Sequence, residues 1–313
     1  MRLVFWGTSG FAVPSLHALV GEGFDVVGVV TQPDRAAGRS RSELIPPPVK
    51  SAAIAEELPV FQPEKANDEQ FLAQLRALEP ELSIVISYGH ILRPSVISLP
   101  TLGTINVHAS LLPQLRGAAP IQGAVRAGLA ETGVTIMRMV QALDAGPILL
   151  QTRTPVARDE TAGELEARLS ELGALALVEA LTLMSLGKLA ETPQNDALAT
   201  YAPKIEREMA RIDWSMSADE VGRHVRAYDP KPGAFTSHRG ADVKLFGAVT
   251  AGSATGSAHA PGELLSIDGH GMRVACGSGV VIITSAQPAG RNRLDPAEWM
   301  RGRGVEVGER FGA

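Results

Sequence analysis

Residues 3–10 read LVFWGTSG, an apolar run that ends in two glycines three positions apart. The four apolar residues predict a buried strand, and the helical spacing of residues 11–20 predicts a helix directly after it. Dinucleotide-binding folds place GxGxxG at such a junction, but here the pattern is GxxG, and the chain has no GxxxxGK(S/T) motif. We therefore interpret residues 7–10 as a tight turn, with an anion contact at the helix N-terminus as the alternative.

Strands and helices continue to alternate through the first half of the chain. Short apolar runs predict four more strands, at residues 25–30, 83–87, 104–107 and 134–139. Helical patterns separate most of them, at about 49–57, 67–78 and 118–128. This order predicts an α/β fold with a mostly parallel sheet and helices on both faces, which binds ligands beyond the carboxyl ends of its strands.

The second half of the chain has a different pattern. An amphipathic helix is predicted at 161–187, with Thr161 and Glu164 as a capping box, and a polar stretch follows. Beyond a short helix at 217–228, closely spaced strands at 243–246, 262–267, 272–275 and 280–285 predict a small β-barrel. We therefore expect two domains, residues 1–189 and 207–313, joined by a linker at 190–206.

Composition limits the classes of function. The formal net charge of −5 gives no overall sign of nucleic-acid binding, so an RNA contact must come from a local basic patch. A single cysteine, Cys276, excludes an internal disulfide and predicts a reducing, cytoplasmic environment. The apolar run at the N-terminus is too short for a signal peptide or a membrane span, so no membrane contact is expected.

Residues 105–113, INVHASLLP, carry the strongest chemical signal. Asn106 and His108 share one face of a predicted strand and lie at its carboxyl end. An amide donor beside an imidazole suits acyl transfer, in which a carbonyl oxygen gains charge. Asp144 follows the next strand in the turn LDAGP, where it would favour the charged imidazole and raise the pKa of His108. Each residue alone also has a structural interpretation, as a turn or hydrogen-bonding residue.

Asn-x-His-x-Ser-Leu-Leu-Pro at 106–113, followed by Leu-Asp-x-Gly at 143–146, resembles the folate-dependent formyltransferases, which use 10-formyltetrahydrofolate. Further similar stretches lie at residues 31–35, 46–50, 88–89, 116–122, 131–137 and 210–214. The similarity covers most of residues 1–290. It implies an N-terminal Rossmann-like domain with the folate site and a C-terminal barrel that resembles an OB-fold.

The resemblance also implies roles for individual residues. Asn106, His108 and Asp144 would be catalytic, with Asn106 and a protonated His108 stabilising the oxyanion and no metal required. The residues expected to contact folate are Ser110, Leu111, Leu112 and Pro113, with Tyr88, Gly89, His90, Ile91 and Leu92 in the pterin pocket. His90 and Gln114 depart from residue types that are common in the family.

Within the family, the similarity is greatest to the branch whose acceptor is initiator methionyl-tRNA, and it implies a monomer. Residues 33–50 form a Gly/Pro-rich stretch in which four basic residues face two acidic ones. It is interpreted either as a solvated surface loop or as the family's inserted loop that enters the acceptor-stem end of the tRNA. The expected RNA contacts are Arg39 first, then Arg41, with Arg35, Lys204 and Arg207.

Other acceptors stay open at this point. Formyltransferases of the same family act on glycinamide ribonucleotide, on amino-sugar nucleotides or, as hydrolases and dehydrogenases, on water or a further domain. The basic stretch and residues 210–214 favour tRNA. An RNA-binding protein with an inactive first domain is an alternative from a different class, which the intact Asn106, His108 and Asp144 argue against.

Overall fold

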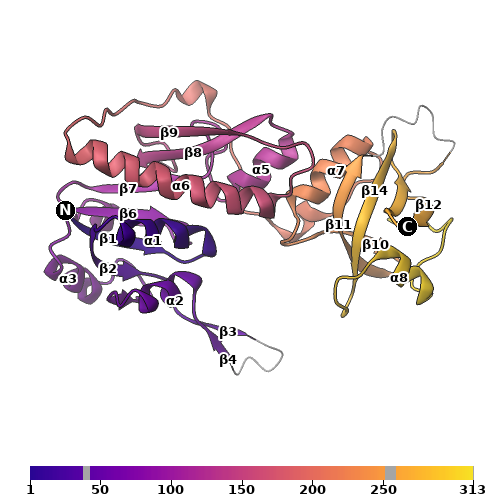
Figure 1. The fold of residues 1–313 in the computed structure, drawn as a ribbon, viewed down its shortest axis with the longest axis horizontal. Helices are drawn as coiled ribbons and strands as arrows, with labels where there is room; N and C mark the ends of the chain where they lie inside the picture. Colours follow the sequence, from indigo (N-terminus) through magenta and orange to yellow (C-terminus); the bar gives the residue numbers. More distant parts are fainter. Residues whose placement is uncertain (38–42, 251–258, 313) are drawn as a thin grey trace. The chain divides into compact units, whose positions relative to one another are not determined.

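The structure, a computed structural model, describes residues 1–37, 43–250 and 259–312. The chain divides into two compact units, each made of several segments (Figure 1). The first unit comprises Met1–Gly117, Thr132–Thr154 and Glu166–Tyr201, and the second comprises Ala118–Glu131, Pro155–Leu165 and Ala202–Ala313.

A seven-stranded sheet forms the centre of the first unit, in the order β5-β2-β1-β6-β7-β8-β9. The pairs β5–β2, β2–β1, β1–β6 and β6–β7 are parallel, whereas β7 and β8 are antiparallel. The sheet is therefore mostly parallel, as predicted. Its strands are β1 (Arg2–Gly7), β2 (Asp25–Val30), β5 (Val60–Phe61), β6 (Leu82–Ile86), β7 (Thr104–His108), β8 (Glu131–Arg138) and β9 (Ile148–Pro155).

Helices bury the apolar side chains of this sheet. Alternate residues of a strand point to opposite faces, and Trp6 of β1 packs edge-on against Phe71 of α3, with ring centroids 5.9 Å apart. In α6, a Cβ on Gly173 would lie 3.2 Å from Val107 of β7, so this helix packs closely on the sheet. The helices are η1 (Gly10–Ala12), α1 (Val13–Gly21), α2 (Pro48–Ala55), α3 (Glu69–Ala77), α4 (Pro94–Ile97) and α6 (Ala162–Ser185).

The predicted capping box at the start of α6 is confirmed. The Thr161 backbone N–H and hydroxyl donate to Glu164 Oε2 at 2.9 and 2.8 Å, and the Glu164 N–H donates to Thr161 Oγ1 at 3.2 Å. These bonds satisfy backbone groups that have no partner inside the helix.

The second unit contains a five-stranded antiparallel sheet in the order β10-β11-β14-β13-β12. Trp214, Tyr228 and Phe311 are buried in its apolar core. Helix α5 packs against α7 in the same unit. The elements are α5 (Pro120–Ala127), η3 (Arg207–Ala210), α7 (Ala218–Ala227), β10 (Ala234–His238), β11 (Ala241–Thr250), β12 (Leu264–Asp268), β13 (Gly271–Ala275), β14 (Val280–Pro288) and α8 (Pro296–Arg301).

The stretch at 33–50 is more regular than predicted from its glycine and proline content. Two short strands, β3 (Arg35–Ala37) and β4 (Glu43–Ile45), pair antiparallel, and α2 begins at Pro48. Lys50 Nζ donates to both carboxylate oxygens of Asp34, at 2.8 and 2.7 Å. This ion pair neutralises one of the four basic side chains that the sequence placed in the stretch.

None of the helices in the described part of the chain is both long and apolar enough to cross a membrane.

Candidate active site

Asn106 and His108 lie at the carboxyl end of β7, between β6 and β8. They are two residues apart in a strand, so their side chains point to the same face. Asn106 is half-buried, and its side-chain amide makes no hydrogen bond to any residue that the structure describes. His108 is only 6% exposed. The strand thus presents one free amide donor beside one enclosed imidazole, as the sequence predicted.

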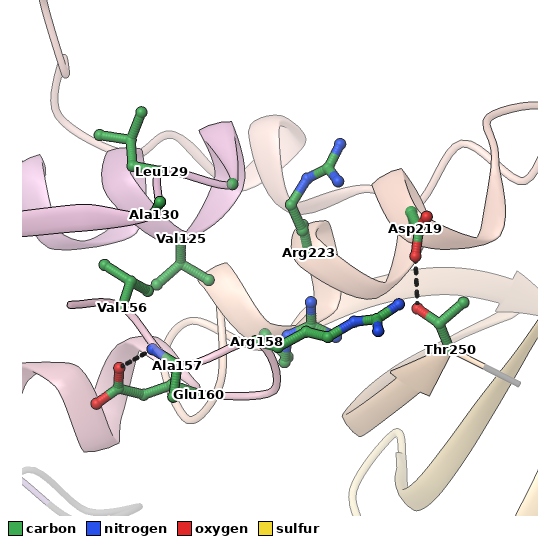
Figure 2. Close-up of a pocket in the computed structure, with 12 residues that line it drawn as sticks. Val125, Leu129, Ala130, Val156, Ala157, Arg158, Glu160, Asp219, Arg223 and Thr250 are labelled. Atoms are coloured by element: carbon green, nitrogen blue, oxygen red, sulfur yellow. Dashed lines mark hydrogen bonds between the residues drawn. The ribbon is translucent and has the colours of Figure 1, made fainter. Parts of the chain in front are cut away.

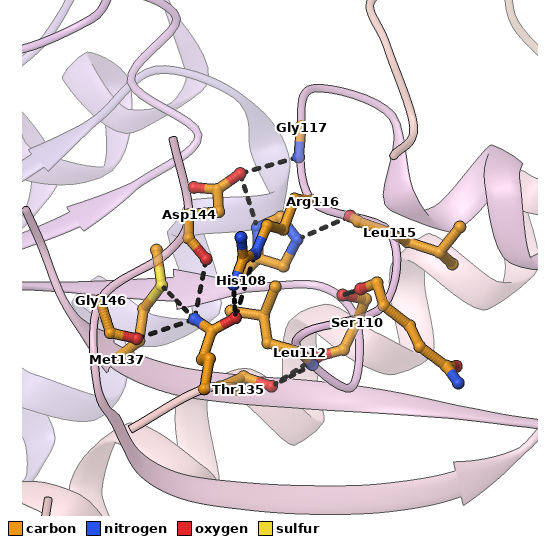
Figure 3. A network of polar contacts seen from close by, with 12 residues as sticks. His108, Ser110, Leu112, Leu115, Arg116, Gly117, Thr135, Met137, Asp144 and Gly146 are labelled. Carbon is orange, nitrogen blue, oxygen red and sulfur yellow. Dashed lines mark hydrogen bonds and ion pairs between the residues drawn. The ribbon is translucent and has the colours of Figure 1, made fainter. Parts of the chain in front are cut away.

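The orientation of the His108 ring follows from its hydrogen bond. His108 Nε2 lies 3.0 Å from the carbonyl oxygen of Leu115, which can only accept, so Nε2 carries the proton. Nδ1 then faces Asp144 Oδ2 at 3.8 Å, as Figure 3 shows. That distance is too long for a hydrogen bond, but close enough for a strong charge interaction in a buried site.

The pKa of His108 shifts in the opposite direction to the predicted one. Burial disfavours the charged imidazole and lowers its pKa below the usual value, while the Asp144 carboxylate and the Leu115 carbonyl partly oppose the shift. The expected effect of Asp144 is present, but desolvation is larger. His108 is therefore neutral at pH 7, with a lone pair on Nδ1, rather than protonated in the resting state.

Asp144 is held in place from both its side chain and its backbone. Its Oδ2 accepts the backbone N–H of Gly117 at 2.8 Å, and its φ of 47° lies in the left-handed region. Gln194 Nε2 donates to the carbonyl oxygens of Asp144 and Gly146 at 2.8 and 2.7 Å. A Cβ on Gly146 would lie 1.8 Å from the Arg138 carbonyl oxygen, so only glycine fits there. The turn is thus fixed around the carboxylate.

Gln194 is in turn oriented by Arg116. Its Oε1 accepts from Arg116 Nε and Nη2 at 3.1 and 2.7 Å, and Arg116 Nη2 also lies 2.6 Å from Asp196. The Arg116 side chain is almost fully buried. Sequence analysis did not identify Gln194, which lies in the polar stretch expected to be a linker. No local pattern marks a glutamine that acts on a turn 50 residues away.

The segment that follows β7 is fixed by hydrogen bonds, and four of its residues were predicted to contact folate. Thr135 Oγ1 donates to the Ser110 carbonyl at 2.6 Å and accepts the Leu112 N–H at 3.1 Å. The Ser110 hydroxyl donates to the Gln114 carbonyl at 2.6 Å. Ser110 and Leu112 are buried, whereas Leu111 and Pro113 are half-buried and leave part of their apolar surface accessible.

The predicted pterin residues fall into two groups. Tyr88 and Leu92 belong to the apolar core, and burial raises the pKa of Tyr88 to about 12, with Gln32 opposing the shift. Gly89, His90 and Ile91 are exposed, and Ile91 is 89% accessible. Sequence analysis did not single out Thr31, the residue directly after β2, whose buried hydroxyl has no hydrogen-bond partner in the described part of the chain.

The turn at residues 7–10 has a visible structural role. Thr8 Oγ1 donates to the Tyr88 carbonyl at 2.8 Å and accepts the Gln32 N–H at 3.4 Å, and Ser9 Oγ donates to Ser87 Oγ at 2.8 Å. These bonds connect the segments that follow β1, β2 and β6. They support the interpretation of this junction as a tight turn.

The predicted RNA contacts are spread over both units. Arg35 is exposed on β3 in the first unit, whereas Arg39 and Arg41 lie outside the described residues. Lys204 and Arg207 are exposed in the second unit, where Arg207 forms an ion pair with Asp242.

Across the described residues, no group of three or more His, Cys, Asp or Glu side chains is placed to hold a metal ion.

Comparison with known proteins adds to this geometry. Residues 1–181 match the model of the family "Formyl transferase", and residues 204–304 match "Formyl transferase, C-terminal domain". A curated "Methionyl-tRNA formyltransferase" from Moorella thermoacetica is 45% identical over 313 residues, covering 100% of this chain and 99% of the relative. Another of the same name, from Pseudomonas putida, is 47% identical over 294 residues, covering 94% and 93%.

Among solved structures, HypX from Aquifex aeolicus in complex with tetrahydrofolic acid has a TM-score of 0.67 and 21% identity. The match covers 99% of this chain and 48% of HypX, so this chain spans about half of that protein. At 21% identity, this similarity shows only that the two proteins share a fold.

Proposed function

This chain belongs to the methionyl-tRNA formyltransferase family, and we propose that it moves the formyl group of 10-formyltetrahydrofolate to the α-amine of initiator methionyl-tRNA. One observation carries the chemical part of the proposal. His108 Nδ1, unprotonated in the resting state, faces Asp144 Oδ2 at 3.8 Å, and Asn106 on the same strand face has a free amide. A base and an oxyanion donor, converging at a strand end, are what formyl transfer to an amine requires.

In the proposed reaction the methionyl amine attacks the formyl carbon of the folate. His108 Nδ1 removes a proton from the attacking nitrogen, and the Asn106 amide donates a hydrogen bond to the carbonyl oxygen as it becomes negative. Asp144 and the Leu115 carbonyl stabilise the imidazolium that forms. His108 then returns the proton to N10 as the carbon–nitrogen bond breaks, and the imidazole ends the cycle neutral. The proton balance needs neither a metal nor a covalent enzyme intermediate.

The proposed folate site lies beyond the carboxyl ends of β6 and β7. The chemistry of the accessible groups there fits a pterin and its linker: the free Asn106 amide and the exposed apolar side chain of Ile91. A pterin ring offers hydrogen-bond donors and acceptors on its edge and two apolar faces. Ser110 to Pro113 would form the opposite wall, where Leu111 and Pro113 keep accessible apolar surface.

The RNA part of the proposal assigns Arg35, Arg39 and Arg41 to the acceptor end of the tRNA, and Lys204 and Arg207 to its backbone. Arginine suits this role because its planar guanidinium binds phosphate and stacks on unpaired bases. We further propose that residues 1–189 act as the catalytic domain and residues 207–313 as the tRNA-binding domain, joined through 190–206. The enzyme would act as a monomer in the cytoplasm.

An acceptor-choice assay tests the proposal. Labelled 10-formyltetrahydrofolate is offered together with methionyl-tRNA, glycinamide ribonucleotide or an amino-sugar nucleotide, and release of formate measures transfer to water. We expect the label in formylmethionyl-tRNA, with initiator tRNA preferred over elongator tRNA. Label in either small acceptor, or in formate, with none in tRNA would refute the assignment.

A further inference from the structure

A polar cavity lies within the second unit, apart from the residues used above. Its volume is about 300 Å³, and it is formed by α5 and the residues after it, by the turn that follows β9, and by α7 and the end of β11. Figure 2 shows Val125, Leu129 and Val156 at one side, with Glu160 near them, and Arg223 and Asp219 at the other. A cavity of this volume with an apolar side can hold an organic group as well as an ion.

Three arginines line this cavity: Arg158, Arg223 and Arg226. Arg223 and Arg226 are three residues apart on α7, so their side chains project from one face of the helix. Arg226 is 5% exposed, and its Nη1 donates to the Ala248 carbonyl at 2.8 Å. The Nε atoms of both α7 arginines are buried without a hydrogen-bond partner in the described part of the chain. Donors in such a position are costly unless a ligand accepts from them.

Two carboxylates, Glu160 and Asp219, line the same cavity, so the three guanidinium groups leave an excess of one positive charge over these two. Glu160 Oε2 accepts the Ala157 backbone N–H at 3.0 Å. Asp159 lies 4.0 Å from Arg226, but its own side chain is 58% exposed. Asp219 accepts from the Thr250 hydroxyl at 2.9 Å. For Arg158 and Arg223, the structure records no hydrogen bond or ion pair within residues 1–37, 43–250 and 259–312. The lining therefore keeps a small excess of positive charge, and its arginine donors are less occupied than its carboxylate acceptors.

Arg223 is also held in position by the backbone opposite. A Cβ on Gly128 would lie 2.7 Å from Arg223 Cδ and 3.0 Å from its Nε, so the arginine stem lies directly against this glycine. Gly128 has a φ of 64° and ends α5. A guanidinium fixed before binding loses less conformational entropy when a ligand arrives.

We propose that this cavity binds a phosphate group, held by Arg158, Arg223 and Arg226, with the organic part of the ligand against the apolar wall. The forked guanidinium donors match the geometry of phosphate oxygens, and three of them exceed what a single carboxylate can use. The phosphate belongs either to a free nucleotide or to an RNA backbone. The RNA alternative rests on the proposed tRNA-binding role of residues 207–313, but the binding test itself needs no formyl transfer, so its failure is distinguishable from a loss of that activity.

The test is calorimetric titration of the full chain at constant ionic strength with three probes: inorganic phosphate, AMP, and an RNA oligomer without terminal phosphates. Two variants change the cavity: Arg158→Gln alters an exposed side chain and should leave the fold intact, and Arg223→Gln removes a buried Nε. Arg301→Gln on α8 is the matched control. We expect binding by the unchanged protein and by the control. Each pocket variant should weaken it by about ten- to hundredfold, because a charge-assisted hydrogen bond is lost.

The probe that responds identifies the source of the phosphate. Phosphate and AMP binding that both pocket variants weaken supports a free ligand, and binding of the oligomer alone, weakened in the same way, supports an RNA backbone. If no probe binds, or if Arg158→Gln and Arg223→Gln bind like the Arg301→Gln control, the proposal is wrong.

Discussion

Gln194 donates a hydrogen bond to the backbone carbonyl of Asp144 at 2.8 Å, and so holds the turn that carries the proposed catalytic carboxylate. The contact joins a residue of the stretch expected to be a linker to a turn after β8. We interpret Gln194 as a positioning residue, because its amide orients Asp144 without reaching the reacting atoms.

Gln194→Glu tests that role. The carboxylate can still accept from Arg116, but it cannot donate to the carbonyls of Asp144 and Gly146, so the turn should shift. We expect kcat to fall by about 10²-fold, as a displacement near 1 Å can cause. The KM for methionyl-tRNA and the thermal midpoint should change little. Gln114→Glu, an exposed change in the segment after β7, is the control. An equal fall in the control, or an unchanged kcat in Gln194→Glu, would contradict the interpretation.

The pH profile of Asp144→Asn tests the electrostatics of the pair. The neutral form of His108 is the base, so activity should fall as the pH drops through its pKa. Asp144 raises that pKa against the larger effect of burial. Removing the carboxylate should therefore move the acid limb of kcat/KM to lower pH, while the maximal rate falls by about 10²–10⁴-fold. A limb that moves to higher pH would show that Asp144 acts differently.

Much of the fold could be predicted because its signals are local. The apolar run before Gly7 and the pair Thr161 and Glu164 each report on structure within a few residues. Five strands were missed. β3, β4 and β5 are only two or three residues long, β9 alternates weakly between buried and exposed residues, and β10 is a short polar-ended strand.

The site was predicted less completely, for two physical reasons. The contacts of Gln194 depend on residues far apart in the chain, which no spacing rule detects. The direction of the His108 pKa depends on burial, and the sequence shows the charged neighbour but not the loss of water around the ring. Pattern reasoning alone also left the structural interpretations of Asn106 and Asp144 open.

Arg39→Ala tests the predicted RNA contact in the stretch between β3 and β4. We expect the KM for methionyl-tRNA to rise, with a weaker dependence of binding on salt, because a phosphate or base contact is lost. The KM for 10-formyltetrahydrofolate should stay unchanged. Lys50→Ala is the comparison, since Lys50 already pairs with Asp34. Steady-state kinetics with charged tRNA that show no difference between Arg39→Ala and the unchanged protein would remove this contact.

Cys276 provides a test of the second unit. It is 1% exposed, and burial raises the pKa of its thiol to about 11. Alkylation requires the thiolate, so the folded protein should stay unmodified by iodoacetamide at pH 8, whereas the protein in guanidinium chloride should react fully. Mass spectrometry gives both values. Rapid labelling of the folded protein would show that the core around β13 is open.

The single-turnover rate of formyl transfer to methionyl-tRNA in Asn106→Ala tests the central claim most directly. The Asn106 amide has no protein partner in the described residues, so the variant should fold normally, and saturating concentrations of both substrates keep any loss of binding out of the measured rate. We predict a rate that is lower by about 10²–10³-fold, the usual cost of losing an oxyanion donor. A rate within a few-fold of the unchanged protein would contradict the proposed site.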